Sequence, residues 1–365
     1  MDINELKELL KTVANDDYIS DLHLTVYSRP IIREDGRLKA HPDYPDKLKG
    51  EDLQRFARHM MVDNHYEEFE EKGEVDFSYS LPGVSRFRVN AYHQRGSIGI
   101  ALRVISNEVP TIEGMNLPQV LKNLAAQRMG LLLSTGPTGS GKSTTQAAVI
   151  NEINESRRCH IVTLEDPIEY MHRHNKSLVH QREVGEDTTS FARGLRACLR
   201  QDPDVILVGE MRDLETIQIA LEAAETGHLV LATLHTNSAP ATIERIIDVF
   251  PASQQQQVRI QLASVISGVI AQQLMPMKNT QGRVAAFEIM IATAAIRNII
   301  LEGKTNQLYS AIQTGGKHDM ITMDNYLLNL YNQGKISRET IIRRCNNLDY
   351  IKERLGFEGQ RSFRG

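Results

Sequence analysis

Cysteine is scarce in this sequence: Cys159, Cys198 and Cys345 are the only three in 365 residues. Because they are widely spaced and odd in number, they suggest neither a disulfide framework nor a Cys-x-x-Cys metal site, and we expect a reducing compartment. Long apolar runs are also missing, whereas a membrane-spanning helix needs about 20 apolar residues. Met1–Leu10 is acidic and amphipathic, which argues against a signal peptide. We therefore expect a protein that reaches a membrane only through partners.

The sequence also lacks a strong excess of charge of one sign. The formal net charge is −4, which gives no electrostatic reason to expect bulk nucleic-acid binding. What is present is ordinary for a soluble globular protein, with 41% hydrophobic and 24% charged residues. A chain of 365 residues exceeds the usual size of one domain, so two domains are predicted.

The first hundred residues combine helical patterns with segments that alternate between apolar and polar side chains. The predicted elements are a helix at 3–13, a strand at 21–26, a hairpin turn at 34–37, one helix at 50–71 and strands at 75–79, 87–91 and 98–104. They predict a small, strand-rich α/β domain over residues 1–105. A linker at 106–118, with two prolines and a glycine, leads to a second domain at 119–365.

A phosphate-binding loop is the strongest signal in the chain. Leu131–Gln146 reads LLLSTGPTGSGKSTTQ, where a strand precedes G-x-x-x-x-G-K-[ST] and a helix follows. Glycines permit backbone conformations in which successive N–H groups point at phosphate oxygens. A purely structural glycine-rich turn is the alternative, and the strand–loop–helix context disfavours it. Lys142 is expected to reach the β- and γ-phosphates and Ser143 to ligate Mg²⁺; the predicted nucleotide-binding residues are Gly136, Pro137, Thr138, Gly139, Ser140, Gly141, Lys142, Ser143 and Thr144.

Beyond residue 119, short apolar strands alternate with helical segments. Cys159–Leu164, Val205–Val208 and Leu229–Leu234 are each followed by polar residues and then by a helical pattern. This order predicts parallel strands in a doubly wound sheet. Ligands of such sheets lie beyond the carboxyl ends of the strands, so the polar residues there are candidates for the site.

Acidic residues follow two of these strands. Glu210 is placed to hold Mg²⁺ directly or through water. Glu165 is assigned as the base that orients water for attack on the γ-phosphate, with Glu169 as second choice. Taken singly, each acid is more often a solvated loop residue, but their shared place beyond strands beside a phosphate loop favours function.

Two histidines flank the strand at 229–234. At about 3.3 Å per residue the extended stretch between them covers roughly 23 Å, so they cannot serve one site within one subunit. His235, at the carboxyl end, is the candidate γ-phosphate sensor. His228, at the opposite end, is interpreted as structural or as an interface residue.

Four segments of the sequence resemble known motifs: GPTGSGKSTT, TLEDPIEY, DPDVILVGEMRDLETI and TGHLVLATLHTN. They are similar to the Walker A loop, aspartate box, Walker B strand and histidine box of the secretion and type IV pilus motor ATPases. The likeness extends to SDLHL and RFRVNAYHQRG in the first domain. AIRNII at 295–300 resembles the signature of the retraction branch, with Ile299 in place of leucine.

This resemblance implies a PAS-like fold for the first domain, a RecA-like P-loop ATPase domain and a homo-hexameric ring. ATP and Mg²⁺ are expected between the two domains and near subunit junctions, with arginines of the first domain reaching the triphosphate. Arg88, Arg95 and Arg103 match that role, although the same residues also suit a solvated strand face. The ring is expected in the cytoplasm, peripheral to an inner-membrane pilus platform protein, with no direct contact to nucleic acid.

The implied function is an ATP-hydrolysing motor that drives pilus disassembly and retraction, and so twitching motility, adhesion or DNA uptake. A pilus assembly or type II secretion motor is the main alternative, but we expect it to carry extra N-terminal sequence and a Cys-x-x-Cys zinc insertion. A hexameric nucleic-acid translocase is more remote, because no aromatic and basic residues interleave. A non-hydrolysing switch would lose acids such as Glu165 or Glu210.

The segment AIRNII also has a helical pattern. Its i, i+4 neighbours form an apolar band, from which Arg297 and Asn298 are predicted to lean away. A core-facing helix is one interpretation of the band. The resemblance favours a role in force transmission.

Overall fold

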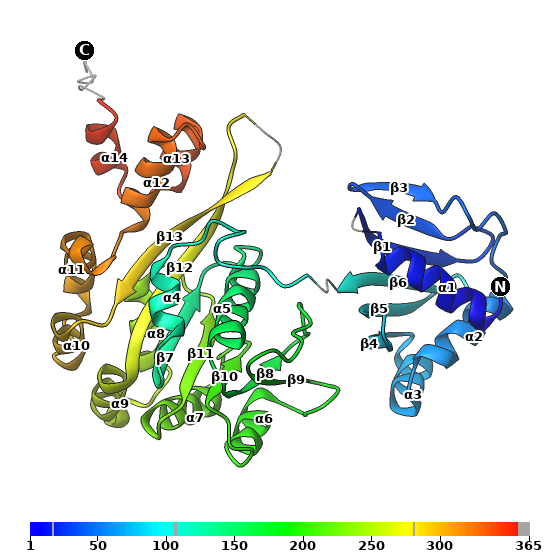
Figure 1. Ribbon diagram of the computed structural model, residues 1–365, viewed down its shortest axis with the longest axis horizontal. Coiled ribbons are helices and arrows are strands. Elements are labelled where there is room, and N and C mark those ends of the chain that lie inside the picture. Colours follow the sequence, from blue (N-terminus) through cyan, green and yellow to red (C-terminus); the bar gives the residue numbers. More distant parts are fainter. Residues whose placement is uncertain (17, 106–107, 280–281, 357–365) are drawn as a thin grey trace. The chain divides into compact units, whose positions relative to one another are not determined.

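The computed structural model describes residues 1–16, 18–105, 108–279 and 282–356. The chain divides into two compact units, Met1–Val109 with Pro167–His172, and Pro110–Asp166 with Arg173–Gly365 (Figure 1). The boundary at Val109 and Pro110 falls within the predicted linker, whose residues 106 and 107 lie outside the described residues. The predicted domain bounds, 1–105 and 119–365, stay a prediction.

The first unit is one antiparallel sheet with three helices, in strand order β3-β2-β1-β6-β5-β4. Its core is formed by the inward face of the sheet together with Leu6, Leu10, Phe56 and Phe69 of the helices. The elements are α1 (Ile3–Ala14), β1 (Ile19–Thr25), β2 (Ile31–Glu34), β3 (Arg37–Ala40), α2 (Gly50–Met60), α3 (Asp63–Lys72), β4 (Glu74–Leu81), β5 (Ser85–Gln94) and β6 (Ser97–Ile105).

The single helix predicted at 50–71 is wrong, because the structure has two helices there. Met61 and Val62 adopt extended backbone angles between α2 and α3. This break lets the Met61 side chain enter the core, where it is 6% exposed. The periodic pattern continues across the break, which is why the spacing alone did not reveal it.

The second unit contains a seven-stranded sheet in the order β13-β12-β7-β11-β10-β8-β9. Neighbouring strands from β12 to β9 are parallel, and only the pair of β12 and β13 is antiparallel among the described strands of this sheet. The strands are β7 (Gly130–Thr135), β8 (His160–Glu165), β9 (Leu178–Glu183), β10 (Val205–Val208), β11 (Leu229–Leu234), β12 (Ile266–Pro276) and β13 (Arg283–Ile291).

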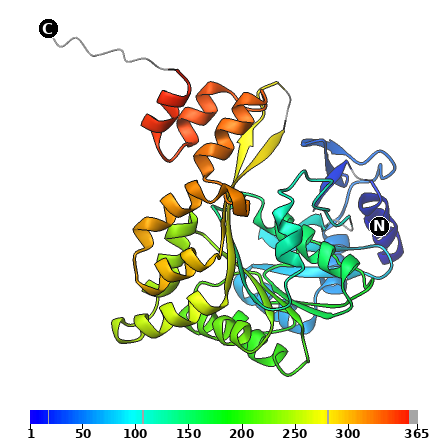
Figure 2. The ribbon, with the colours of Figure 1, turned by 60° about the vertical axis from the view of Figure 1, so that its left-hand side comes forward.

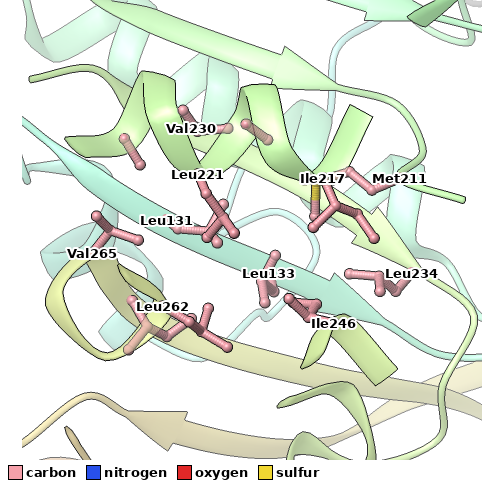
Figure 3. Close-up of a cluster of buried hydrophobic side chains, with 14 of the residues drawn as sticks. Leu131, Leu133, Met211, Ile217, Leu221, Val230, Leu234, Ile246, Leu262 and Val265 are labelled. Atoms are coloured by element: carbon pink, nitrogen blue, oxygen red, sulfur yellow. The ribbon is translucent and has the colours of Figure 1, made fainter. Parts of the chain in front are cut away.

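Helices cover both faces of this sheet. Alternate residues of the strands, such as Leu131 and Leu133, pack against helices α6 to α10 (Figure 3). The intervening residues, such as Leu132, pack against α4 and α5. The helices are α4 (Val120–Ala125), α5 (Lys142–Ser156), α6 (Phe191–Cys198), α7 (Leu214–Glu225), α8 (Ala239–Asp248), α9 (Ala252–Val265), α10 (Ala294–Leu301), α11 (Leu308–Thr314), α12 (Met323–Asn332), α13 (Arg338–Arg344) and α14 (Leu348–Arg354), with short 3₁₀ turns at Thr305–Gln307 and Gly316–His318.

The C-terminal helices lie beside the β12–β13 hairpin (Figures 1 and 2). Met275 and Ala286 of the hairpin share a small core with Leu327 of α12. Two buried carboxylates add hydrogen bonds here. Glu288 of β13 accepts the Met323 amide N–H of α12 at 3.4 Å, and Asp324 of α12 accepts the Asn346 amide N–H, between α13 and α14, at 2.7 Å. Among the residues that the structure describes, no helix has the length and hydropathy of a membrane span.

The Arg297 side chain contacts the neighbouring helix α9. Its guanidinium donates hydrogen bonds to the carbonyl oxygens of Ala263 and Ser264, at the C-terminal end of α9. That Arg297 leans away from the apolar band of its own helix stays a prediction. Partial burial lowers the pKa of this guanidinium. Ile296 and Ile300 of the same helix are fully buried, whereas Ala295 is exposed and Ile299 is half-buried, so part of the apolar band faces the core.

We therefore expect Arg297→Ala to destabilise the protein by about 1 kcal/mol, because two helix-end carbonyls lose their donor. The thermal midpoint, followed by circular dichroism, measures the loss. Asn298→Ala on the exposed side of α10 is the matched control and should have little effect. Equal midpoints for Arg297→Ala and wild type would show that these hydrogen bonds do not support the fold.

Candidate functional site

The phosphate loop joins β7 to α5. Gly136 has φ of +146° and Gly141 has φ of +90°, both in the region that favours glycine. A Cβ atom on Gly136 would lie 2.3 Å from the Gln272 carbonyl oxygen, so no larger residue fits there. The backbone N–H groups of the first turn of α5 supply the electrostatically favourable end of a helix for an anion.

Lys142 lies at the centre of this loop and is 9% exposed. Its Nζ atom donates to the Gly136 carbonyl at 2.7 Å and to the Pro137 carbonyl at 3.2 Å. Burial lowers the pKa of Lys142, while the charge of Glu210 acts in the opposite direction. Ser143 is exposed in the first turn of α5, where its hydroxyl can meet solvent or a ligand.

The carboxyl edge of the sheet brings Glu210 and His235 together. β10 and β11 are neighbours, and these residues follow their ends. His235 Nε2 lies 3.0 Å from Glu210 Oε1, and the Arg212 guanidinium forms an ion pair with the same carboxylate. Glu210 is 16% exposed at its side chain, so its carboxylate is largely shielded from solvent and contacts both the Arg212 guanidinium and the His235 ring.

Glu165 ends β8, which is the third strand from β7. At about 4.8 Å per strand, its backbone is roughly 14 Å from the strand that leads into the loop. Thr163 Oγ1 donates to Glu165 Oε1 at 2.6 Å, and Gln181 Nε2 donates to the same oxygen at 3.1 Å. These bonds fix the carboxylate. Glu169 belongs to the segment 167–172, which groups with the first unit.

The three predicted arginines do not form one cluster. Arg88 and Arg103 are directly opposite each other on β5 and β6, with exposed side chains. Arg103 Nε forms an ion pair with Asp21 Oδ1 at 2.9 Å. Arg95 lies in the β5–β6 turn with φ of +50°. Seven residues of strand place it about 23 Å from Arg88, so the two cannot contact one phosphate from the same chain.

His228 lies at the opposite end of β11 from His235, as predicted. Its ring Nδ1 is 2.9 Å from the Ala223 carbonyl oxygen, near the end of α7. Its own carbonyl accepts the Gly130 amide N–H at 3.0 Å. These contacts give His228 a structural role within the chain.

Sequence reasoning missed several polar residues around the loop. Thr135, Thr236 and Thr242 form a row of hydroxyl contacts from the end of β7 to α8. Thr145 Oγ1 donates to Gln272 Oε1 at 2.7 Å, so α5 is tied to β12. The sequence contains only a weak signal for this contact. Two glutamines interrupt the apolar run at 269–275, which indicates a strand whose polar side chains form hydrogen bonds inside the protein.

The residues suit a Mg²⁺–nucleotide better than a metal bound by protein alone. Within the described parts of the chain, no group of three or more His, Cys, Asp or Glu residues could hold a metal ion. The Ser143 hydroxyl and the Glu210 carboxylate are hard oxygen donors, and Mg²⁺ commonly takes one or two such protein donors together with substrate phosphates.

The phosphate loop lies at the carboxyl edge of a parallel sheet and contains Lys142. An acid, Glu210, follows β10, the second strand away from β7. These features define the class of P-loop nucleotide-binding proteins. The family model described as "Type II/IV secretion system protein" matches residues 85–324. The chain belongs to this type II/IV secretion system protein family.

Individual relatives agree with this assignment. The chain is 50% identical over 335 residues to the type IV pilus retractation ATPase PilT of Pseudomonas aeruginosa, covering 92% of this chain and 96% of the relative. It is 46% identical to a twitching motility protein of Neisseria gonorrhoeae, covering 88% of this chain and 85% of the relative. A crystal structure of the pilus retraction motor PilT with bound ADP superposes with a TM-score of 0.86 at 47% identity, covering 95% of this chain and 99% of that one.

These findings confirm the predicted resemblance to the pilus retraction ATPases. They also confirm the predicted fold class, an N-terminal α/β domain followed by a RecA-like domain. The parallel sheet was predicted, whereas its antiparallel edge strand β13 was not.

Proposed function

We propose that this protein is a hexameric motor that hydrolyses ATP to drive type IV pilus disassembly and retraction, and so twitching motility. One observation carries the proposal: the contact of 3.0 Å between His235 and Glu210 at the sheet edge beside the phosphate loop. This contact supports a shared site for Glu210, the proposed Mg²⁺ ligand, and His235, the proposed γ-phosphate sensor. The 50% identity to a pilus retraction ATPase supports the motor function.

Binding of ATP follows from the loop. Backbone N–H groups of Gly136 and of residues 138–144 surround the phosphates, and the Lys142 ammonium moves from its carbonyl partners to the β- and γ-phosphate oxygens. Ser143 and Glu210 would hold Mg²⁺, which would neutralise phosphate charge and orient the γ-phosphate. The pyrophosphate end of the nucleotide thus meets both the loop and the acid on the second strand.

Hydrolysis needs a water molecule aimed at the γ-phosphorus. Glu165 accepts a proton from this water while the oxygen of the water bonds to the γ-phosphorus. The bond from the γ-phosphorus to the β,γ-bridging oxygen breaks, which releases ADP and phosphate. The hydrogen bonds from Thr163 and Gln181 keep the Glu165 carboxylate oriented. His235 senses the γ-phosphate, and the hydroxyl contact of the adjacent Thr236 with Thr242 extends to α8.

Arg88 and Arg103 neutralise charge that develops on the γ-phosphate. Arg95 is too far along the strand to contact the same phosphate from the same chain, so it contacts a different part of the assembly. In a ring, these arginines can act on the nucleotide of their own subunit or on the nucleotide of a neighbouring subunit. The ring docks in the cytoplasm on an inner-membrane platform protein. The Cys-x-x-Cys zinc insertion expected of an assembly or secretion motor is missing from the sequence, and all three cysteines are free.

ATPase activity measured alongside native mass tests the proposal. We expect ATP- and Mg²⁺-dependent release of phosphate by a species with six times the mass of the chain. Lys142→Ala should keep the native mass and lose activity, because the loop lacks its cation. A protein that stays monomeric and inactive with ATP and Mg²⁺ would overturn the proposed function.

A further inference from the structure

The strand β12 lies directly beside the strand that leads into the phosphate loop. Its parallel pairing with β7 ends at Ala271 and Thr135. The next residues, Gln272 and Gly136, are therefore at the same level, where β7 turns into the loop. Gln272 is 3% exposed, so its amide is buried against this turn.

Both ends of the loop pack against Gln272. A Cβ on Gly136 would meet the Gln272 carbonyl oxygen at 2.3 Å, and a Cβ on Gly141 would meet its Nε2 at 2.7 Å. The side-chain Oε1 also accepts the Thr145 hydroxyl at 2.7 Å. Thr145 lies in the first turn of α5 and is 1% exposed, so neither partner can readily exchange this bond for water.

We propose that Gln272 is a positioning residue for the nucleotide: its side-chain amide fixes the phosphate loop by packing against Gly141 and by accepting the Thr145 hydroxyl, while its backbone carbonyl lies against Gly136. The inference rests on the proposed function, because it concerns the phosphates that this loop would hold. A nearly rigid loop binds phosphate more tightly, since less conformational freedom is lost on binding. A buried glutamine with only a structural role would instead change the stability of the fold and leave affinity unchanged.

Binding of the fluorescent nucleotide mant-ADP to the assembled full chain tests this role. Gln272→Met keeps the volume but removes the acceptor, so the Thr145 hydroxyl is left buried without its partner. We expect Kd to rise about tenfold, with a parallel rise in KM for ATP and a smaller change in kcat. Gln272→Glu should weaken binding further, because it adds a buried negative charge beside the phosphates. Gln273→Met, the next residue on the opposite side of the strand, is the matched control and should match wild type.

A double-mutant cycle separates positioning from general damage. Thr145→Val removes the hydroxyl from the other side and should raise Kd by a similar factor, whereas Thr145→Ser should not. The double variant Gln272→Met with Thr145→Val should bind no more weakly than the weaker single variant. If Gln272→Met does not fold, the comparison of Thr145→Val with Thr145→Ser still decides the question.

Several outcomes would overturn the inference. One is an unchanged Kd in folded Gln272→Met, or in Thr145→Val. Another is a loss in the double variant equal to the product of the single losses, because the two side chains would then act independently. Wild-type protein that fails to bind mant-ADP would count against the proposed function itself, which distinguishes the two failures.

Discussion

Replacing Glu165 with glutamine is expected to reduce ATP turnover by about 10²–10⁴-fold while ATP binding persists. The introduced amide keeps the size of the side chain, and its oxygen can still accept the hydrogen bond from Thr163. It cannot take a proton from water, so only the chemical step is lost. Single-turnover phosphate release measures hydrolysis, and mant-ATP binding measures affinity.

Two further variants sharpen this test. Lys142→Ala should weaken nucleotide binding itself, whereas Glu165→Gln should keep binding and lose turnover. Asp166→Asn also replaces a carboxylate with an amide, at the exposed residue next to Glu165, and should leave most turnover intact. Normal hydrolysis in Glu165→Gln would move the base to another acid, with Glu169 the next to be replaced.

The second large effect is expected from the first-unit arginines. An arginine that neutralises charge on the transferred phosphate contributes on the order of 10³–10⁵ to the rate. Arg88→Ala should therefore reduce ATPase activity strongly, with little change in the native mass. Arg103→Ala should also reduce the activity but by less, because the Arg103 guanidinium already pairs with Asp21; its side chain is opposite that of Arg88.

Mixed rings decide where Arg88 acts. Arg88→Ala and Lys142→Ala subunits are each inactive alone, but a junction between them restores one complete site if the arginine crosses the boundary. We expect partial recovery of phosphate release when the two are mixed and exchange is verified by mass. Verified mixed rings without recovery would place Arg88 within its own subunit's site.

Local signals predicted much of this molecule. The strands at 205–208 and 229–234 have the predicted bounds, because short buried strands are continuous apolar runs. The phosphate loop was equally local, since its glycines, lysine and hydroxyls are consecutive. The rule that ligands lie beyond parallel strands brought Glu210 and His235 to one edge, and the structure places them in contact.

Other features depend on contacts that no local pattern contains. Gln272 is separated from Thr145 by 127 positions, and nothing in its own neighbourhood indicates the loop. Arg297 donates hydrogen bonds to carbonyls that are 33 and 34 residues earlier, and helical spacing within its own segment could not predict these partners. The break between α2 and α3 likewise follows from where Met61 is buried, not from a change in periodicity.

The position of β7 between β11 and β12 has a consequence for the order of folding. Thr135, the last residue of β7, contacts the hydroxyl of Thr236, which is 101 positions later in the chain. The hydrogen bond between Thr145 and Gln272 beside the loop joins residues that are 127 positions apart. Contacts of such sequence separation close large loops and form late, because chain entropy must be lost before they are gained. A nascent chain that has passed its Walker motifs therefore still lacks a finished nucleotide site. On the proposed function, we therefore expect ATP to stabilise the second unit only after β12 has joined the sheet, so that the nucleotide acts on the completed fold and does not template it.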